Sequence, residues 1–590
     1  MDIESSIVKD FLLEIDESSP WHFKVERADG EAEGVEIFNF TMRADRMLVP
    51  QSFTLRWTLC DTDIHYRWTP STYFDVFLPP EWHAASESSL ALNMPLMYFG
   101  STNGENRFLF AVSEAKKLLR FRGGLREEDN CVHCKVEFFI SPDAPLSEYH
   151  FSLRFDARKL FYAENLRDAT NWFESLPGYA PLDVPSAARE VLYSTWYSYH
   201  QNVFAETLEK EYELAAQLGM KSAILDDGWQ TEDNHRGYAY CGDWQVMKSR
   251  FPDMREHVRR VHALGMKYMV WFSVPFIGKY STNLKRFKGK FLVDGSAGKL
   301  RAAILDPRFP EVRQFLIDTF AGAVRDWELD GLKLDFIDNF RFDGDDPAVA
   351  ENYAGRDIKS LPDAIDCLMT GIMKSLREIK PDILIEFRQC YIGPAIRHYG
   401  NMLRAGDCPG DLLSNRRRTL DLRLISGKTA IHSDMLEWHY DDSVENAALQ
   451  LLNVLFCVPQ ISVRIAELKR DHYQMLKHYI DFWRAHRELL LDGDLRPYHP
   501  ELQYPLVTTE KDGEFLAALY AVNQCVYIPD NAQKSYIINA SCETAVLVKM
   551  PRKMQIEILD VCGVKVEDLS LDFGWHELTI PLAGMAKLHI

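Results

Sequence analysis

Short apolar segments alternate with longer amphipathic segments between residues 191 and 491, and this alternation limits the possible folds more than any other feature of the chain. The apolar segments have the length of buried strands, and the amphipathic segments repeat apolar residues at helical spacing. Strands that alternate with helices pair in parallel, and eight such units close into a barrel. We therefore predict a (β/α)8 TIM barrel over residues 186–493. Its strands are expected at residues 191–199, 222–229, 267–275, 331–338, 382–388, 401–407, 429–436 and 458–465.

The segments between these strands carry helix signals. Gly219 and Gly265 follow two of them, where a glycine after the last helical turn is expected. The expected helices cover residues 205–219, 253–265, 310–330, 361–380, 415–427, 443–456 and 467–491.

The two flanks of the barrel have strand patterning. Over residues 1–185, segments such as "SFTLRWTLCD" and "CVHCKVEFFIS" place β-branched and aromatic residues between turn-forming residues, which predicts a sandwich. A proline-containing linker at residues 176–190 leads out of it. Residues 494–590 return to strand patterning, as in "FLAALYAVNQCVYI". We predict a multidomain protein: an N-terminal β-sandwich (1–185), the central barrel (186–493) and a small C-terminal antiparallel β-domain, also a sandwich (494–590).

The charge balance excludes several partners. A formal net charge of -20 is unsuited to nucleic acid or an anionic membrane surface, because both require a positive protein surface. No apolar run reaches the roughly 18 residues of a membrane-spanning helix. The segment "MDIESSIVKDFLLEIDESSP" has no basic stretch followed by an apolar run. We therefore expect no secretory signal, no membrane partner and a cytoplasmic location.

The 11 cysteines are scattered, and an odd number of thiols without a signal fits a reducing compartment. Cys131 and Cys134 form a C-x-x-C pair, but no second pair follows at zinc-ligand spacing. A catalytic metal is the competing interpretation for a carboxylate-rich barrel, and His432 with Asp434 comes nearest to a ligand pair on a strand. We expect no metal and no cofactor.

Two charged residues interrupt the apolar stretch "DGLKLDFIDNF" at residues 330–340. Lys333 and Asp335 are two residues apart, and side chains at that spacing on a strand share one face. Burying charges is costly unless they are paired or needed. From these residues alone, a structural salt bridge and a functional pair are equally good interpretations.

Other polar residues also occupy the strand ends, where barrel enzymes carry their reacting groups. Together they would give the mouth carboxylates, cations and aromatic rings. A sugar site requires this mixture, because hydroxyls need charged partners and pyranose faces need flat apolar surfaces. Taken singly, Asp226 and Asp227 could be turn residues and Trp271 a core residue. The strand-end residues are Trp196, Tyr199, Asp226, Asp227, Trp229, Trp271, Lys333, Asp335, Asp338, Glu386, Arg388, Arg404, Asp407, His432, Asp434 and Trp438.

Four segments resemble glycoside hydrolase family 36: "SAILDDGW", "GDWQVMKSRFPDMREHVRRVHALGMKYMVWF", "GLKLDF" and "RAGD". The resemblance extends over residues 191–466, and the order of the predicted domains agrees with it. The family contains α-galactosidases, α-N-acetylgalactosaminidases and raffinose or stachyose synthases. It implies a retaining, exo-acting hydrolase that removes terminal α-linked galactose from an oligosaccharide or glycoside. Relatives are often oligomers, so we expect a homo-oligomer.

The resemblance also implies a role for each matching residue. Asp335 becomes the nucleophile, and Asp407 becomes the general acid/base, with Asp411 as its rival. We expect the two carboxyl groups to lie roughly 5–5.5 Å apart. Lys333 is expected to hold Asp335 ionised, and the charge on Asp335 is expected to raise the pKa of Asp407. The implied sugar-binding residues are Asp226 and Asp227 for the 4- and 6-hydroxyls, Lys333 and Arg404 beside the carboxylates, Trp271 for the wall, Trp196 and Tyr199 for the edge, and Arg388 and Asp434 as further candidates.

The segment after the fifth strand departs from the family pattern. Many relatives place a glycine-rich C-x-G-G-type turn there, which contacts the 2-substituent of the sugar, whereas this chain has "IEFRQCYIGP". Arg388 or Gln389 could bind a free 2-hydroxyl, or Arg388 could neutralise Glu386. Long side chains leave little room for an N-acetyl group. The alternatives are a transglycosylase of the raffinose-synthase type, a retaining α-glycosidase for a different sugar, and a non-catalytic carbohydrate-binding barrel.

Overall fold

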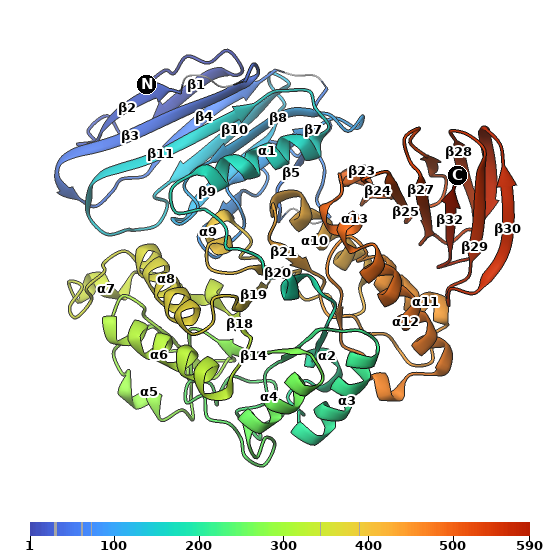
Figure 1. Cartoon of the computed structure of the whole chain (residues 1–590). Helices are drawn as coiled ribbons and strands as arrows, with labels where there is room; N and C mark the ends of the chain where they lie inside the picture. Colours follow the sequence, from blue (N-terminus) through green and yellow to red (C-terminus); the bar gives the residue numbers. More distant parts are fainter. Residues whose placement is uncertain (29–31, 61–62, 72–73, 343, 389) are drawn as a thin grey trace.

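The computed structural model describes residues 1–28, 32–60, 63–71, 74–342, 344–388 and 390–590. Gln389, one of the two candidates for the sugar 2-hydroxyl, lies outside the described residues. Figure 1 shows a sandwich at the N-terminal end, a central barrel surrounded by helices, and a β-domain at the C-terminal end. Within the described ranges, no helix is long and apolar enough to cross a bilayer.

Eight parallel strands form the central barrel, in the order β21-β20-β19-β18-β14-β13-β12-β22. A parallel bridge between His432 and Val458 joins the two ends of this order and closes the barrel. The predicted TIM-barrel architecture is thereby confirmed. The strands are β12 (Leu192–Ser194), β13 (Ser222–Leu225), β14 (Lys267–Ser273), β18 (Gly331–Asp335), β19 (Leu384–Arg388), β20 (Met402–Arg404), β21 (Ala430–His432) and β22 (Gln460–Ile461).

Helices follow the strands and cover the outside of the barrel (Figure 1). The connection after β19 is reduced to one turn, α9 (Pro394–Arg397). The single helix expected at residues 467–491 is divided at His486, whose backbone (φ -111°, ψ 18°) has left the α-helical region. The other barrel helices are α3 (Ala205–Gln217), α4 (Met254–Ala263), α6 (Pro310–Trp327), α7 (Pro347–Ala350), α8 (Leu361–Ile379), α10 (Leu412–Ile425), α11 (Val444–Leu452), α12 (Arg470–Ala485) and α13 (Arg487–Asp492).

The first expected strand is wrong in its second half. β12 ends at Ser194, and Trp196–Tyr199 form the one-turn helix α2. Thr195 already has a helical backbone, and its side-chain oxygen accepts a hydrogen bond from the backbone N–H of Asp226. The aromatic residues of this segment favour strands by propensity, but the chain turns here at the barrel mouth, and tertiary position overrides propensity.

An insertion after β14 was not expected from the sequence. Residues 276–305 form a small antiparallel sheet and one helical turn before α6 begins. The ring of Phe276 stacks on Phe336 at 4.7 Å, so the insertion supports the segment that follows β18. Its elements are β15 (Phe276–Gly278), α5 (Asn283–Arg286), β16 (Phe291–Val293) and β17 (Ala302–Leu305).

The N-terminal domain is a sandwich of two antiparallel sheets, β1-β4-β10-β9-β6 and β2-β3-β11-β8-β7-β5. Aromatic rings fill its core, where Trp57 packs on Phe110 and on Phe155, each at 4.9 Å. The helix α1 (Tyr162–Ser175) ends this part of the chain, which we had expected to be β-rich throughout. The strands are β1 (Lys9–Glu14), β2 (His22–Arg27), β3 (Val35–Leu48), β4 (Phe53–Leu59), β5 (Tyr66–Trp68), β6 (Ser86–Ser88), β7 (Leu96–Gly100), β8 (Asn106–Val112), β9 (Leu119–Arg126), β10 (Cys131–Phe138) and β11 (Leu146–Asp156).

The C-terminal domain has a large sheet, β23-β24-β25-β27-β32-β29-β30, and a small one, β26-β28-β31. Most pairs are antiparallel, and β25–β27 and β26–β28 are parallel. Apolar side chains of both sheets, among them Ile537, Val548 and Leu588, form its core. The strands are β23 (Arg496–Tyr498), β24 (Leu506–Lys511), β25 (Glu514–Leu519), β26 (Cys525–Tyr527), β27 (Lys534–Asn539), β28 (Ala545–Met550), β29 (Met554–Leu559), β30 (Lys565–Leu571), β31 (Gly574–Thr579) and β32 (Met585–His589).

The N-terminal sandwich reaches the mouth of the barrel. The backbone N–H of Asn93, between β6 and β7, donates to the carbonyl of Cys390 in the loop after β19, at 2.6 Å. The thiol of Cys390 lies 4.0 Å from the carbonyl of Ala91. The sandwich therefore helps to fix the loop that differs from the family pattern.

A buried carboxylate ties the three domains together. Asp421 of α10 accepts hydrogen bonds from Trp68 of the sandwich (3.1 Å) and Tyr504 of the C-terminal domain (2.6 Å). On its other oxygen it accepts from Arg417 Nε at 2.8 Å. Asp421 and Arg417 are both buried, so each needs the other's charge.

We expect Asp421→Ala to lower the free energy of unfolding by about 3–5 kcal/mol, because it leaves the Arg417 guanidinium buried without its carboxylate. Denaturant unfolding followed by tryptophan fluorescence measures this. Glu256→Ala is the matched control, because it breaks exposed pairs with Arg259 and Arg260 and should not move the midpoint. An unchanged midpoint for Asp421→Ala would show that the junction contributes no stability.

Candidate active site at the mouth of the barrel

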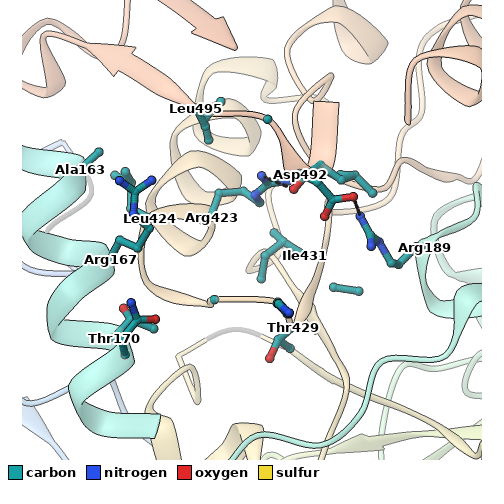
Figure 2. A pocket seen from close by; sticks show the side chains of 16 residues that line it. Ala163, Arg167, Thr170, Arg189, Arg423, Leu424, Thr429, Ile431, Asp492 and Leu495 are labelled. Carbon is teal, nitrogen blue, oxygen red and sulfur yellow. Dashed lines mark hydrogen bonds and ion pairs between the residues drawn. The ribbon is translucent and has the colours of Figure 1, made fainter. Parts of the chain in front are cut away.

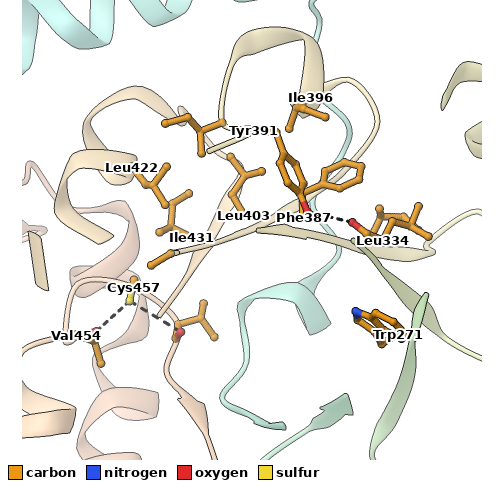
Figure 3. Close-up of a cluster of buried hydrophobic side chains, with 14 of the residues drawn as sticks. Trp271, Leu334, Phe387, Tyr391, Ile396, Leu403, Leu422, Ile431, Val454 and Cys457 are labelled. Carbon is orange, nitrogen blue, oxygen red and sulfur yellow. Dashed lines mark hydrogen bonds between the residues drawn. The ribbon is translucent and has the colours of Figure 1, made fainter. Parts of the chain in front are cut away.

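Toward the carboxyl ends of the barrel strands, outward-facing apolar residues alternate with inward-facing polar residues. Figure 3 shows Leu334, Phe387, Leu403 and Ile431 packing between the strands and the outer helices. Alternation along a strand then directs the residue after or before each of them into the barrel. The inward set formed in this way is Lys333, Asp335, Glu386, Arg388, Arg404 and His432.

Four of these polar residues, Lys333, Asp335, Arg388 and Arg404, border a small cavity of about 50 Å³ at the carboxyl ends of the strands. Ligand pockets usually enclose roughly 300–1,000 Å³. A sugar ring therefore needs side chains at this mouth to move aside. The cavity is lined by Trp196, Asp226, Asp227, Tyr238, Trp271, Lys333, Asp335, Phe336, Arg388, Arg404 and Asp407.

Lys333 pairs with Asp226 rather than holding Asp335. Its Nζ lies 2.5 Å from Asp226 Oδ2, and both side chains are buried. The expectation that Lys333 is the counter-ion of Asp335 is wrong. The shared strand face did not determine the ion-pair partner of Lys333. Its long side chain reaches the carboxylate of Asp226 at the end of β13, which is also buried and needs a cation.

Asp227 is fixed by two glutamines. Gln201 Nε2 donates to one carboxylate oxygen at 2.7 Å and Gln230 Nε2 to the other at 2.6 Å. The amide oxygens of both glutamines accept backbone N–H groups, from Arg236 and Gly228, which orients their NH2 groups toward Asp227. Burial nevertheless dominates and raises the pKa of Asp227 to about 7.

Asp335, at the end of β18, is surrounded by donors. Trp271 Nε1 donates to Oδ2 at 2.8 Å, and the backbone N–H of Phe336 donates to Oδ1 at 2.7 Å. Tyr391 OH lies 3.4 Å from Oδ1, and Arg388 Nε makes an ion pair with the same oxygen. Phe336 has φ +65°, the left-handed region that a bulky residue rarely adopts, so strain sits directly beside the candidate nucleophile.

Arg388, at the end of β19, neutralises Asp335 and not Glu386. Glu386 instead accepts a hydrogen bond from Gln460 Nε2 at 2.5 Å. The guanidinium of Arg388 lies 4.6 Å from the centre of the Phe336 ring. The proposal that Arg388 compensates Glu386 is therefore wrong, and Arg388 lies across the candidate nucleophile.

Asp407 lies beyond the end of β20 and pairs with Arg404 Nη2 at 2.8 Å. Its side chain is 45% exposed, whereas Arg404 is buried. Burial raises the pKa of Asp407, but attraction to Arg404 and Arg388 outweighs burial and holds it well below the usual range. The expectation of a raised pKa is thus contradicted in this state, because the attraction of Asp407 to the neighbouring cations outweighs the effect of burial.

Two predicted sugar ligands do not line the cavity. Asp434 is fully buried, forms an ion pair with Arg404, and accepts hydrogen bonds from Tyr197 OH (2.7 Å) and from the backbone N–H of Cys408 (2.6 Å). It therefore positions Arg404. Tyr199 is buried, with Arg464 4.9 Å from its ring centre.

Two cavity residues were missed by the sequence analysis. Tyr238 belongs to the loop after β13, and its ring packs on Phe336 at 4.8 Å and on Trp271 at 6.3 Å. No spacing in the sequence connects Tyr238 with the strands. Phe336 could have been found, since it directly follows Asp335 at a strand end.

The rival acid, Asp411, has a structural role. Its carboxylate accepts hydrogen bonds from the backbone N–H (3.0 Å) and the hydroxyl (2.6 Å) of Ser414, so it is the N-cap of α10. It does not line the cavity. Asp338, in the short helix η2 (Ile337–Asn339), also lies outside it.

A larger pocket of about 400 Å³ lies at the opposite end of the barrel (Figure 2). Ala430 and Ile431, at the start of β21, form part of its wall, with Arg189 and Asp492 paired at its edge at 2.6 Å. Because barrel enzymes react at the carboxyl ends of their strands, we place the candidate site in the smaller cavity.

The family model described as Melibiase matches residues 180–391 of this chain. Curated relatives include alpha-galactosidase Mel36A of Lactobacillus acidophilus, 29% identical over 160 residues, which are 25% of this chain and 20% of that protein. The bifunctional alpha-galactosidase/sucrose kinase AgaSK of Mediterraneibacter gnavus is 28% identical over 178 residues, 28% of this chain and 17% of that protein. Over this part the chain is similar to the Melibiase family, in agreement with the predicted resemblance to glycoside hydrolase family 36. The aligned part spans about a fifth of the length of these relatives.

Solved family 36 structures share the fold over the whole chain. The α-galactosidase AgaB of Geobacillus stearothermophilus superposes with a TM-score of 0.66 at 13% identity, covering 100% of this chain and 89% of that one. AgaA of the same organism gives 0.65 at 14% identity, covering 100% and 90%. At this identity the likeness establishes the fold alone.

Proposed function

We propose that this chain is a retaining, exo-acting α-galactosidase that removes terminal α-linked galactose by double displacement. One observation carries the proposal: Asp335 and Asp407 line the same cavity as Asp226, Asp227 and Trp271. This set supplies two carboxyl groups for the reaction, acceptors for distal hydroxyls and an aromatic wall. The relatives that bear the name α-galactosidase support the same choice.

In the first step, an Asp335 oxygen forms a bond to the anomeric carbon while the bond to the leaving oxygen breaks. Asp407 gives its proton to that oxygen. In the second step, Asp407 takes a proton from water, and the water oxygen displaces Asp335 from the sugar with net retention. Trp271 Nε1 and the Phe336 N–H hold the Asp335 carboxylate in place for attack.

Asp407 must first acquire a proton, although Arg404 and Arg388 favour its ionised form. Substrate binding that draws either cation away, or that excludes water from this half-exposed side chain, raises the pKa of Asp407. Arg404 is also held by Asp434, which gives it an alternative partner when Asp407 is neutral.

The experiment that tests the proposal is a panel of aryl α-galactoside, α-glucoside, α-N-acetylgalactosaminide and β-L-arabinopyranoside, with product anomers followed by NMR. We expect release of α-galactose from the galactoside. Turnover of another member alone would select a different sugar. A new oligosaccharide instead of free galactose would indicate the transglycosylase. No turnover at all would favour a carbohydrate-binding barrel.

We expect the affinity for galactose to fall about tenfold between pH 8 and pH 5, because Asp227 becomes protonated below its pKa of about 7 and loses its acceptor-only carboxylate. Only the ionised form accepts on both oxygens, so affinity rises with pH through this range. Calorimetric titration with galactose measures it. Asp227→Asn, which does not ionise, should flatten the pH dependence. An unchanged slope in that variant would assign the titration to another group.

We further propose a homo-oligomer in the cytoplasm. The cysteines are all free thiols in the structure, as suits a reducing compartment. Light scattering at working concentration tests the assembly, and a monomer would contradict it. Cell fractionation tests the location.

A further inference from the structure

The guanidinium of Arg388 has unused hydrogen-bonding capacity inside the cavity. Its side chain is 8% exposed, and its Nε is committed to Asp335. Within the part of the chain that the structure describes, Nη1 and Nη2 have no hydrogen-bond partner. A guanidinium carries five N–H donors in a planar fork, so four remain for a ligand. Arg388 lines the cavity, so a ligand there can supply acceptors to these donors.

The proposed reaction would remove the counter-ion of Arg388. When Asp335 forms a bond to the sugar, its carboxylate becomes a neutral ester. Removing one partner of a buried ion pair leaves an uncompensated buried charge. A ligand that brings its own negative charge to Arg388 stabilises that intermediate and also frees Asp335 for attack.

The order of the strands determines which side of a bound sugar ring would face Arg388. Asp226 and Asp227 follow β13, Asp335 ends β18, and Arg388 ends the next strand, β19. A ring with its 4- and 6-hydroxyls at β13 and its reacting carbon at Asp335 directs carbon 2 toward β19. An anion at carbon 6 would instead meet the carboxylates of Asp226 and Asp227, which repel it.

We propose that Arg388 forms an oxyanion subsite and that the preferred sugar carries an anionic substituent, such as a sulfate ester, on carbon 2. Two parallel N–H···O bonds from the guanidinium would hold the oxyanion, the geometry for which arginine is suited. This inference rests on the proposed α-galactosidase function and names its substrate class.

The same ligand would prepare the general acid. Arg388 is one of the cations that keep Asp407 ionised. A substrate anion on Arg388 weakens that attraction and so favours proton uptake by Asp407 before bond cleavage. In the competing arrangement, the sugar is neutral. Its 2-hydroxyl accepts a hydrogen bond from Arg388, and the carboxylate of Asp407 balances the positive charge of Arg388.

Three substrates separate these arrangements: nitrophenyl α-galactoside, its 2-sulfate and its 6-sulfate. We expect kcat/KM for the 2-sulfate to exceed that of the neutral galactoside by about 10- to 100-fold. The 6-sulfate should fall below the neutral substrate. Equal or faster turnover of the neutral galactoside overturns the inference and leaves the proposed function standing.

Arg388→Gln tests the residue itself. We expect it to lose the preference for the 2-sulfate, a drop in the ratio of the two kcat/KM values of about 10- to 100-fold. Arg341→Gln is the matched control, because it removes a positive charge near the mouth from a residue that does not line the cavity. Arg388→Lys keeps the charge without the fork, and should retain only part of the preference.

A binding measurement keeps the inference testable if no galactoside is turned over. In Asp335→Ala, Arg388 has lost its partner, so calorimetry should show galactose 2-sulfate binding at least tenfold more tightly than galactose. Equal binding of the two sugars overturns the oxyanion subsite. Absence of turnover with preserved 2-sulfate binding would instead overturn the hydrolase and keep the subsite.

Discussion

Asp335→Ala is expected to abolish hydrolysis, lowering kcat by about 10⁵–10⁶, the loss typical of removing a catalytic nucleophile. The reason is geometric as well as chemical. The carboxylate is held by Trp271 Nε1 at 2.8 Å and by the Phe336 N–H at 2.7 Å, an arrangement that no water molecule reproduces. Steady-state kinetics with nitrophenyl α-galactoside measures the loss.

Azide provides the positive test of this assignment. The alanine variant leaves space beside the anomeric carbon, and Arg388, without its carboxylate, attracts the anion. We expect partial recovery of nitrophenol release, with a β-configured glycosyl azide as product. Asp338→Ala, which removes a nearby carboxylate outside the cavity, should retain turnover. Near-normal activity of Asp335→Ala would show that another residue is the nucleophile.

The barrel and its mouth could be predicted because the pattern of the sequence reports directly on both. Parallel strands buried on both faces need apolar residues, so an inward charge such as Lys333 or Asp335 is conspicuous in a strand. Every strand of the barrel falls within a predicted segment. The insertion over residues 276–305 was missed because no helix longer than one turn separates its strands, and the alternation with long helical segments is what marked the equally short strands of the barrel.

Partners within the site could not be predicted in the same way. Strand spacing shows that Lys333 and Asp335 share a face, but the structure pairs them with Asp226 and Arg388, from strands on either side. Which ions pair depends on side-chain reach across the barrel, and that is a tertiary property. The protonation state of Asp407 depends on the same distances, so its pKa was misjudged from the sequence.

The second large effect is expected for Asp407→Ala. A natural disaccharide leaves as an alkoxide and needs the proton, so its turnover should fall by about 10²–10⁴. Nitrophenolate is a good leaving group without a proton. With the nitrophenyl glycoside, formation of the glycosyl-enzyme should be spared and its hydrolysis should become limiting. Azide, which needs no general base, should then accelerate turnover.

Asp411→Ala is the matched control for this prediction, because Asp411 lies four residues along the chain and caps α10 through Ser414. Its loss should lower the free energy of unfolding by about 1 kcal/mol and leave the turnover of both substrates unchanged. Arg404 also distinguishes the two carboxylates, because it pairs with Asp407. Its positive charge favours the ionised form of Asp407, so the reaction requires that this attraction be offset before Asp407 can hold a proton. If Asp411→Ala shows the leaving-group dependence and Asp407→Ala does not, then the acid approaches from the N-terminus of α10, and the Arg404–Asp407 pair is a structural salt bridge.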